Sequence, residues 1–262
     1  MFPELLKIGP LSIKTYGFFV AVGFLAGMNY ARTLARRQSI NPEIVLDLSL
    51  YIIVSGLIGA RIFYVLLNWD FYKKNLLEIF FIWSGGLVLY GGVIFAFMTS
   101  ALYVYFKKLN FFVLSDIFAP AFFLGLAIGR IGCFSAGCCY GKPTSLPWGV
   151  VFTNPDSLVA PSALGLKLHP TQLYESLFSF LLFLGLNFYY KYKKFSGEIF
   201  FSSLIFYSIW RFFVEFIRWD DRGQKIFGLF PSQFISILMC IFSISALVYL
   251  IRRNIDEKKN SS

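Results

Sequence analysis

Charged and hydrogen-bonding side chains occur inside or at the edges of long apolar stretches of this sequence. The set is Tyr16, Arg61, Tyr90, Arg130, His169, Gln172, Tyr174, Glu175, Arg211 and Glu215. A charged group in hydrocarbon costs at least ~2.5 kcal/mol on insertion scales, so several such groups together indicate a functional site. Two structural alternatives are open: snorkelling anchors at a membrane interface, above all for Arg218 and Lys225, and a salt bridge between Arg211 and Glu215, four residues apart on one helix.

The segment from Gly129 to Gly141, GRIGCFSAGCCYG, is the most informative part of the chain. Its glycines, Gly137 and Gly141 among them, let the backbone approach a ligand closely. Arg130 offers a planar, permanently charged guanidinium group that suits a phosphodiester. The segment therefore predicts a phospholipid-headgroup site, with Arg130 pointing inward.

Three of the four cysteines, Cys133, Cys138 and Cys139, lie within seven residues and form one local feature. Three roles are open for them: a redox pair, a transient lipid acceptor at Cys133, or small apolar residues packed beside the glycines. The chain has a single histidine and no cluster of carboxylates inside its apolar runs. Because this is a poor set of metal ligands, the sequence predicts no metal and no cofactor.

The composition indicates that most of the surface of this protein faces lipid. Of 262 residues, 57% are hydrophobic and only 15% are charged, too few to coat a soluble protein of this length. The net charge of +10 comes from short clusters between apolar runs, which argues against a nucleic-acid binder. The first fifteen residues lack the pattern of a cleavable signal peptide, so we expect the first apolar run to stay as a membrane anchor.

Seven stretches are apolar over the roughly 20 residues that a membrane-spanning helix needs. They are about 15–35, 47–67, 86–106, 112–133, 172–190, 198–217 and 232–251. The sequence therefore predicts an all-α polytopic membrane protein that forms a single membrane domain over residues 1–262. Residues 134–171 are expected to be an extracytoplasmic loop or a small head region.

The basic residues between these stretches predict the orientation of the chain. Lys and Arg gather in the first, third and fifth connections and in the C-terminal tail, and basic loops stay in the cytoplasm. Seven spans then put the N-terminus outside, the C-terminus in the cytoplasm and the polar residues in the outer half of the bilayer. This one-sided distribution counts against a transporter, whose polar path should reach both faces.

Six segments, in order and over nearly the whole chain, resemble the prolipoprotein diacylglyceryl transferase family. They are residues 9–17, 59–65 (GARIFYV), 90–92 (YGG), 129–141, 169–175 (HPTQLYE) and 211–218 (RFFVEFIR). The resemblance implies an enzyme of the bacterial inner membrane that moves the diacylglyceryl group of phosphatidylglycerol to the lipobox cysteine of a prolipoprotein signal peptide. Its partners would be membrane lipid and these peptides, with no nucleic acid and no cofactor.

The resemblance also implies roles for individual residues. Arg130 and Arg211 would be catalytic and would stabilise the phosphate as glycerol phosphate leaves. Tyr90 or His169 would be the base that makes the acceptor thiolate. The expected substrate-binding residues are Tyr16, Arg61, Gly91, Gly92, Cys133, Gly137, Gly141, Gln172, Tyr174, Glu175 and Glu215.

The chain departs from the family's pattern at four positions. It has Cys133 and Ala136 where the family has asparagines, Cys138 where the family has an acidic residue, and Tyr90 where the family has a histidine. One alternative is therefore a divergent relative that binds phospholipid but uses another acceptor or has no catalytic activity. A lipid-binding or transport protein of the membrane is another.

Overall fold

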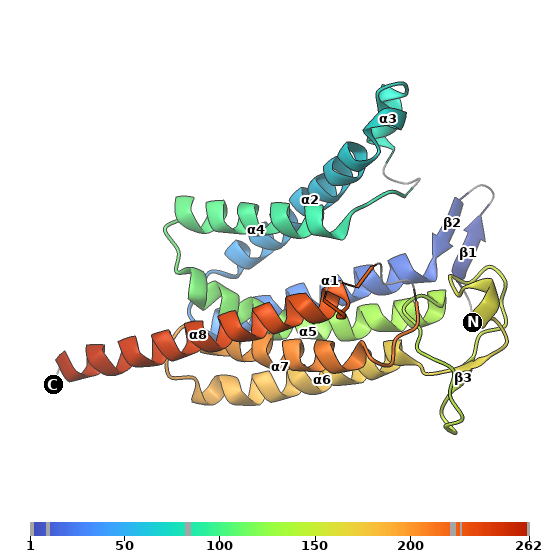
Figure 1. Ribbon diagram of the computed structural model, residues 1–262. Helices are drawn as coiled ribbons and strands as arrows, with labels where there is room; N and C mark the ends of the chain where they lie inside the picture. The colour runs from blue at the N-terminus through green and yellow to red at the C-terminus, as the bar shows by residue number, and fades with distance from the viewer. Residues whose placement is uncertain (1–2, 9–10, 82–84, 221–223, 226, 261–262) are drawn as a thin grey trace. The chain divides into compact units, whose positions relative to one another are not determined.

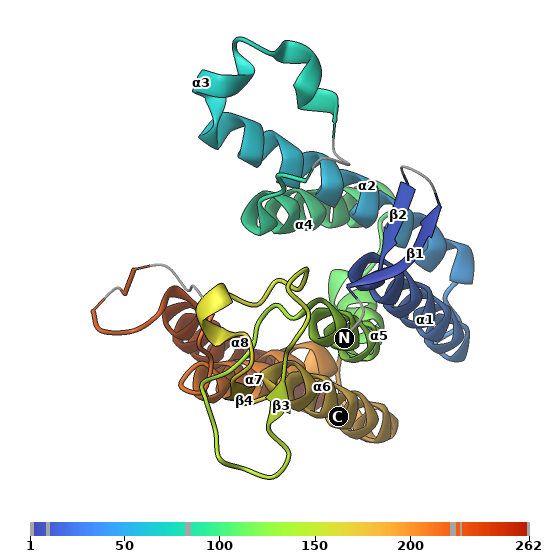
Figure 2. The same ribbon diagram turned by 90° about the vertical axis from the view of Figure 1, so that its right-hand side faces the viewer.

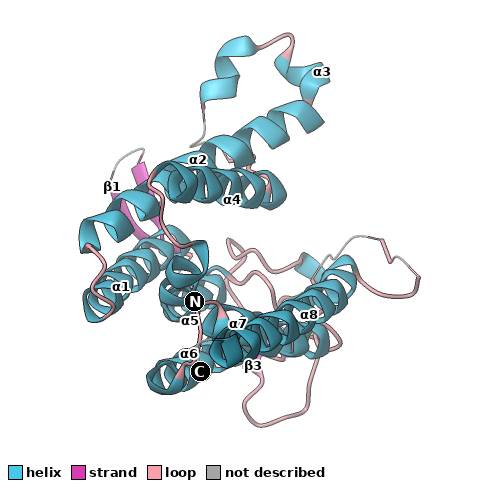
Figure 3. Ribbon diagram, turned by 90° about the vertical axis from the view of Figure 1, so that its left-hand side faces the viewer, coloured by secondary structure: helices cyan, strands magenta, loops and turns pink. Residues whose placement is uncertain are grey.

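The computed structural model describes residues 3–8, 11–81, 85–220, 224–225 and 227–260. Gly9 and Pro10, from the resembling segment 9–17, lie outside the described residues. Helices dominate the described chain (Figure 3), and the protein is a helical membrane protein. The helices that are long and apolar enough to cross a membrane are α1 (Thr15–Arg37), α2 (Pro42–Leu67), α4 (Leu89–Phe106), α5 (Phe111–Ala136) and α8 (Pro231–Asn260).

The chain divides into two compact units. The first comprises residues 1–31 and 115–262, and the second comprises residues 32–114. The first unit includes α6 (Thr171–Tyr189), α7 (Glu198–Val214) and a hairpin of β1 (Glu4–Ile8) with β2 (Leu11–Lys14).

In the first unit, α5, α6, α7 and α8 lie side by side as one bundle (Figures 1 and 2). The beginning of α1 packs on α5 through small residues. A Cβ on Gly23 would lie 2.6 Å from the carbonyl oxygen of Gly125, and one on Gly27 would lie 2.8 Å from that of Ala121. Small residues at such contacts let membrane helices approach closely, and van der Waals packing then holds the helices together.

Asp116 on α5 binds the backbone at the start of α7. Its buried carboxylate accepts hydrogen bonds from the backbone N–H groups of Gly197 (2.7 Å) and Phe200 (2.9 Å), and Lys193 Nζ lies 3.1 Å away. The first N–H groups of a helix have no partner within the helix, so an external carboxylate satisfies them. Asp116 of α5 thus caps the N-terminal end of α7, where Gly197 lies 81 residues further along the chain.

The connection between α5 and α6 has a small hydrophobic core of its own at the end of the bundle (Figure 1). Two short strands, β3 (Val150–Val151) and β4 (Lys167–Leu168), pair antiparallel within it. The buried residues of this core are Tyr140, Phe152, Val159, Ala163 and Leu168. This is the part of the sequence in which a loop or small head region was expected, and its packing holds the backbone that carries the cysteines and His169.

In the second unit, α2 and α4 cross with their backbones in contact. A Cβ on Gly59 would lie 2.5 Å from the carbonyl oxygen of Gly91, and one on Gly92 would lie 3.0 Å from that of Gly56. The short helices α3 (Trp69–Tyr72) and η1 (Leu76–Phe80) connect this pair. Two glycines on each helix therefore set the distance at which the two helices pack.

We expect Gly59→Ala to destabilise the second unit by about 1–3 kcal/mol, because the added methyl group overpacks the contact with α4. Gly185→Ala on α6 is the matched control, since a Cβ there meets no atom within 4 Å. Alanine is also the better helix former, so Gly185→Ala should leave the thermal unfolding temperature in detergent unchanged or raise it. Equal behaviour of the two variants would contradict the close crossing.

Candidate active site

Glu175, in the first turns of α6, joins three helices of the first unit. Its Oε1 accepts a hydrogen bond from Arg130 Nη2 on α5 (2.8 Å) and another from the Tyr207 hydroxyl on α7 (2.9 Å). Its Oε2 lies 3.9 Å from Arg218 Nη1. The Glu175 side chain is only 1% exposed, so the carboxylate and the Arg130 guanidinium form a buried ion pair. Such a pair is costly to break, because one partner would be left as an uncompensated charge.

Two further arginines near the end of α7 are also paired. Arg211 Nη1 lies 2.9 Å from Glu215 Oε2, one helical turn away, and the Glu215 side chain is fully buried. The Arg218 guanidinium donates to both carboxylate oxygens of Asp220, at 3.1 and 2.9 Å. The site thus brings together three guanidinium groups, each held in orientation by a carboxylate.

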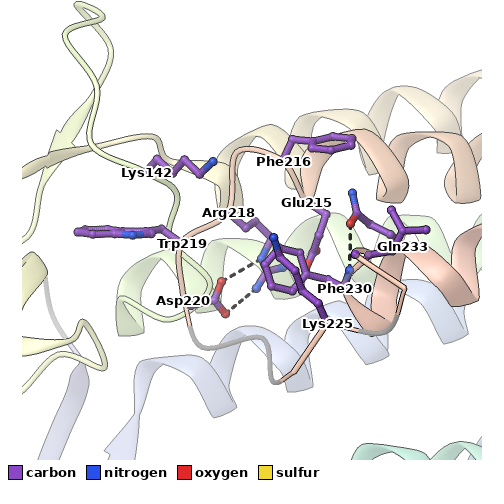
Figure 4. A pocket seen from close by; sticks show the side chains of 11 residues that line it. Lys142, Glu215, Phe216, Arg218, Trp219, Asp220, Lys225, Phe230 and Gln233 are labelled. Atoms are coloured by element: carbon purple, nitrogen blue, oxygen red, sulfur yellow. Dashed lines mark hydrogen bonds and ion pairs between the residues drawn. The ribbon is translucent and has the colours of Figure 1, made fainter.

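A pocket of about 270 Å³ opens beside this network (Figure 4). Its lining contains five charged side chains: Glu215, Arg218, Asp220 and the two lysines Lys142 and Lys225. Aromatic side chains complete it, and the Lys225 Nζ lies 4.9 Å from the centroid of the Phe230 ring. Three cations face two carboxylates in the lining, so the pocket suits an anionic group.

The three sulfur atoms of Cys133, Cys138 and Cys139, here called the thiol cluster, all lie within 4.8 Å of one another. All three are free thiols. Arg130 Nη1 lies 3.9 Å from Cys133 Sγ. Hydrogen bonds from the thiols of Cys133 and Cys138 lower the pKa of Cys139, and the arginine cations at 218 and 130 act in the same direction. The neighbouring thiols and burial raise the pKa of Cys138, so the setting favours a thiolate at Cys139 and not at Cys138.

The backbone after α5 is held by the start of α6. Thr171 Oγ1 donates to the Cys139 carbonyl (2.6 Å), and Gln172 Nε2 donates to the Cys138 carbonyl (2.7 Å). Gly141 N–H donates to the His169 carbonyl (3.0 Å), where a Cβ at 141 would lie 2.7 Å from His169 Cβ. Two predicted site residues thus position the cysteine segment: Gln172 through its side-chain amide, and Gly141 through its backbone N–H.

His169 takes part in a short hydrogen-bond chain. Its Nδ1 lies 3.2 Å from the Tyr174 hydroxyl, which also accepts from Trp148 Nε1 at 2.8 Å. Tyr16 lies at the start of α1, and its side chain is 46% exposed. The α1 backbone at this residue packs on Gly132, where a Cβ would lie 3.2 Å from the Tyr16 carbonyl oxygen.

Four predicted site residues, Arg61, Tyr90, Gly91 and Gly92, belong to the second unit. Arg61 is buried, and it donates to four backbone carbonyls at distances between 2.6 and 3.1 Å; these belong to Glu78, Ile79, Gly85 and Gly86. Every nitrogen of its guanidinium group is engaged, so within its own unit Arg61 organises the connection between α2 and α4. Gly91 lies in the helix crossing described above, and the Tyr90 side chain is 58% exposed.

Sequence reasoning missed two members of the network around Glu175. Arg218 was open to interpretation as a snorkelling anchor, yet it is 5% exposed and ion-paired, which corrects that reading. Tyr207 is not among the predicted site residues, because an aromatic residue in an apolar helix is usually a packing residue. The spacing of Arg211, Glu215 and Arg218, at three and four residues, was the available signal for Arg218.

Comparison with known proteins identifies the family. A family model described as prolipoprotein diacylglyceryl transferase matches residues 3–249. Proteins named phosphatidylglycerol--prolipoprotein diacylglyceryl transferase are similar over most of the chain. The relative from Finegoldia magna is 41% identical over 232 residues, which is 88% of this chain and 88% of that protein.

Two other relatives with the same name give the same result. The Clostridium tetani protein is 38% identical and covers 93% of this chain and 96% of its own length. The Listeria welshimeri protein is 36% identical over 94% of this chain and 89% of its own length. With matches of this extent over both α5 and α7, which carry the paired arginines, the chain belongs to the prolipoprotein diacylglyceryl transferase family.

Proposed function

We propose that this protein transfers the diacylglyceryl group of phosphatidylglycerol to the cysteine thiol of a lipobox in a prolipoprotein signal peptide. The observation that carries the proposal is the family match over residues 3–249. The buried, carboxylate-oriented arginines at one end of the helix bundle support it, because the leaving group is an anionic phosphate.

The reaction forms one C–S bond and breaks one C–O bond. The acceptor sulfur attacks the glycerol carbon that bears the phosphodiester, and the oxygen leaves with the bonding electron pair as part of glycerol phosphate. Negative charge grows on the phosphate during this step, so fixed cations lower the free energy of the transition state. We assign this role to Arg130 and Arg211, with Glu175 and Glu215 fixing their orientation.

The other predicted site residues keep supporting roles in this proposal. Tyr16 hydrogen-bonds the headgroup, and Tyr90 or His169 accepts the proton of the acceptor thiol. Tyr174 orients His169 through the contact between their side chains. The remaining substrate-binding assignments are Arg61, Gly91, Gly92, Cys133, Gly137, Gly141 and Gln172.

We also propose that seven helices span a bacterial inner membrane, with the N-terminus outside and the C-terminus in the cytoplasm. The packing of α6 and α7 alongside α5 and α8 supports this count (Figure 1). At 1.5 Å per residue, the 19 residues of α6 and the 17 of α7 extend over roughly 26–29 Å, close to the ~30 Å of a hydrocarbon core. The site then lies toward the outer leaflet.

The test is glycerol phosphate release by the purified protein in detergent. Phosphatidylglycerol and a lipobox peptide are supplied, and a peptide with serine in place of the cysteine is the control. We expect release that depends on the peptide thiol, together with a gain in peptide mass equal to one diacylglyceryl group. No release from this protein, while the Finegoldia magna relative is active under the same conditions, would overturn the proposal.

A further inference from the structure

The thiol cluster consists of three sulfur atoms from a short stretch of chain that the backbone folds together. Cys133 lies in the last turn of α5, and Gly137 ends this helix with a φ of +82°. Cys139 itself adopts a φ of +63°, which only a few per cent of non-glycine residues do. Such a conformation costs of order 1–3 kcal/mol and persists only where its surroundings enforce it.

Two side chains of α6 enforce the conformation. Thr171 and Gln172 donate to the carbonyl groups of Cys139 and Cys138, and both side chains are 1% exposed. The Cys138 thiol also lies 3.7 Å from the Cys133 carbonyl oxygen. These contacts fix the backbone that carries Cys138 and Cys139, as the outer hydrogen-bond shell of a metal site fixes its ligands.

From this geometry we propose that Cys133, Cys138 and Cys139 bind one Zn²⁺ ion, and that the acceptor cysteine of the substrate supplies the fourth ligand. Zinc prefers tetrahedral sulfur coordination with Zn–S distances of about 2.3 Å, which corresponds to sulfur–sulfur distances of about 3.8 Å. The present limit of 4.8 Å is within a rotamer adjustment of that value. Three protein ligands with one open position are typical of a catalytic zinc site.

The charges around the cluster suit such a centre. Zn²⁺ with three thiolates carries a net charge of −1, and the Arg130 guanidinium lies 3.9 Å from Cys133 Sγ. The backbone of Arg218 pairs with Gly141, two residues after Cys139, so this arginine is also near the cluster. Both cations are buried or nearly so, with side-chain exposures of 16% and 2%, and they therefore act through little solvent screening.

The role of the zinc rests on the transferase activity proposed above. The acceptor thiol would lose its proton to the base assigned above, Tyr90 or His169, as its sulfur binds zinc, and the bound thiolate would attack the glycerol carbon. The C–S bond forms, the C–O bond breaks, and its electron pair leaves on glycerol phosphate. The product sulfur is a neutral thioether and a weaker ligand than a thiolate, so it dissociates. No step changes an oxidation state, as zinc requires.

The first test measures metal binding without any reaction. Protein purified from zinc-supplemented cells is assayed for Zn²⁺ by elemental mass spectrometry, and Co²⁺ substitution is followed through the sulfur-to-cobalt absorption in the near ultraviolet. We expect about one ion per chain and the spectrum of three thiolates. Cys→Ser changes at residues 133, 138 and 139 should lower the bound metal at least tenfold, whereas Cys240→Ser, on α8, should leave it unchanged.

The second measurement adds the acceptor. A lipobox peptide, without phospholipid, should strengthen the Co²⁺–sulfur absorption as the fourth thiolate binds, and the serine peptide should not. Less than a tenth of an ion in the wild-type protein, metal that survives the three substitutions, or a disulfide within the cluster would overturn the proposal. A metal-loaded protein that binds the peptide but releases no glycerol phosphate would keep the zinc site and reject the transferase activity instead.

Discussion

Arg130→Lys should lower the rate of glycerol phosphate release by about 10²–10³-fold while the protein stays folded. Removal of one oriented donor from a developing anion typically costs this much in rate. Lysine keeps the positive charge and can still pair with Glu175. It cannot span from Glu175 to the phosphate as the guanidinium does, because that group presents several donors in one plane.

The matched control is Arg253→Lys, on α8. Arg253 also pairs with a glutamate, Glu257, but both side chains are more than half exposed. An exposed ion pair of this kind contributes little, so we expect unchanged activity and unchanged stability. If Arg130→Lys retained more than a third of the wild-type rate, charge alone would suffice at this position and the orienting role of Glu175 would be wrong.

The apolar runs of the sequence predict where the helices lie but less well where they end. The segment predicted at 47–67 begins at Pro42, because Asn41 caps the helix and proline is favourable in its first turn. The segment predicted at 232–251 continues to Asn260 through a charged turn that lies beyond any apolar window. Hydropathy indicates which residues can lie in the hydrocarbon of a membrane, whereas the ends of a helix depend on local capping.

The partners of the site residues could not be predicted from the sequence. Arg130 and Glu175 are 45 residues apart, and nothing in the spacing of either one selects the other. Only the packing of α6 against α5 brings them together. The short-range pair of Arg211 and Glu215 was open as a salt bridge from its spacing, and it is confirmed at 2.9 Å.

The cysteines show a different limit of sequence reasoning. A single histidine and the absence of a carboxylate cluster in the apolar runs predict no metal site. The positive φ of Cys139 and the side-chain contacts from Thr171 and Gln172 bring three sulfur atoms within 4.8 Å. Neither a backbone dihedral angle nor a contact over more than thirty residues can be read from the spacing of the cysteines.

Glu175→Gln should lower the free energy of unfolding by about 3–5 kcal/mol, because the buried Arg130 guanidinium would lose its carboxylate. Glutamine has nearly the same shape as glutamate, so the loss of unfolding free energy measures the contribution of the negative charge. Tyr207→Phe removes the second hydrogen bond to Glu175 Oε1 and should lower the free energy of unfolding by only about 1 kcal/mol. Both values are measurable by unfolding in mixed detergent micelles.

A double variant separates the structural role of the pair from its catalytic role. Arg130→Met with Glu175→Leu replaces both charges by apolar groups of similar volume, a change that is often neutral for a buried ion pair. We therefore expect the double variant to recover most of the stability that Glu175→Gln loses. Its glycerol phosphate release should nevertheless stay at least 10²-fold below wild type, since no guanidinium faces the phosphate. Recovery of activity together with stability would show that Arg130 serves the fold alone.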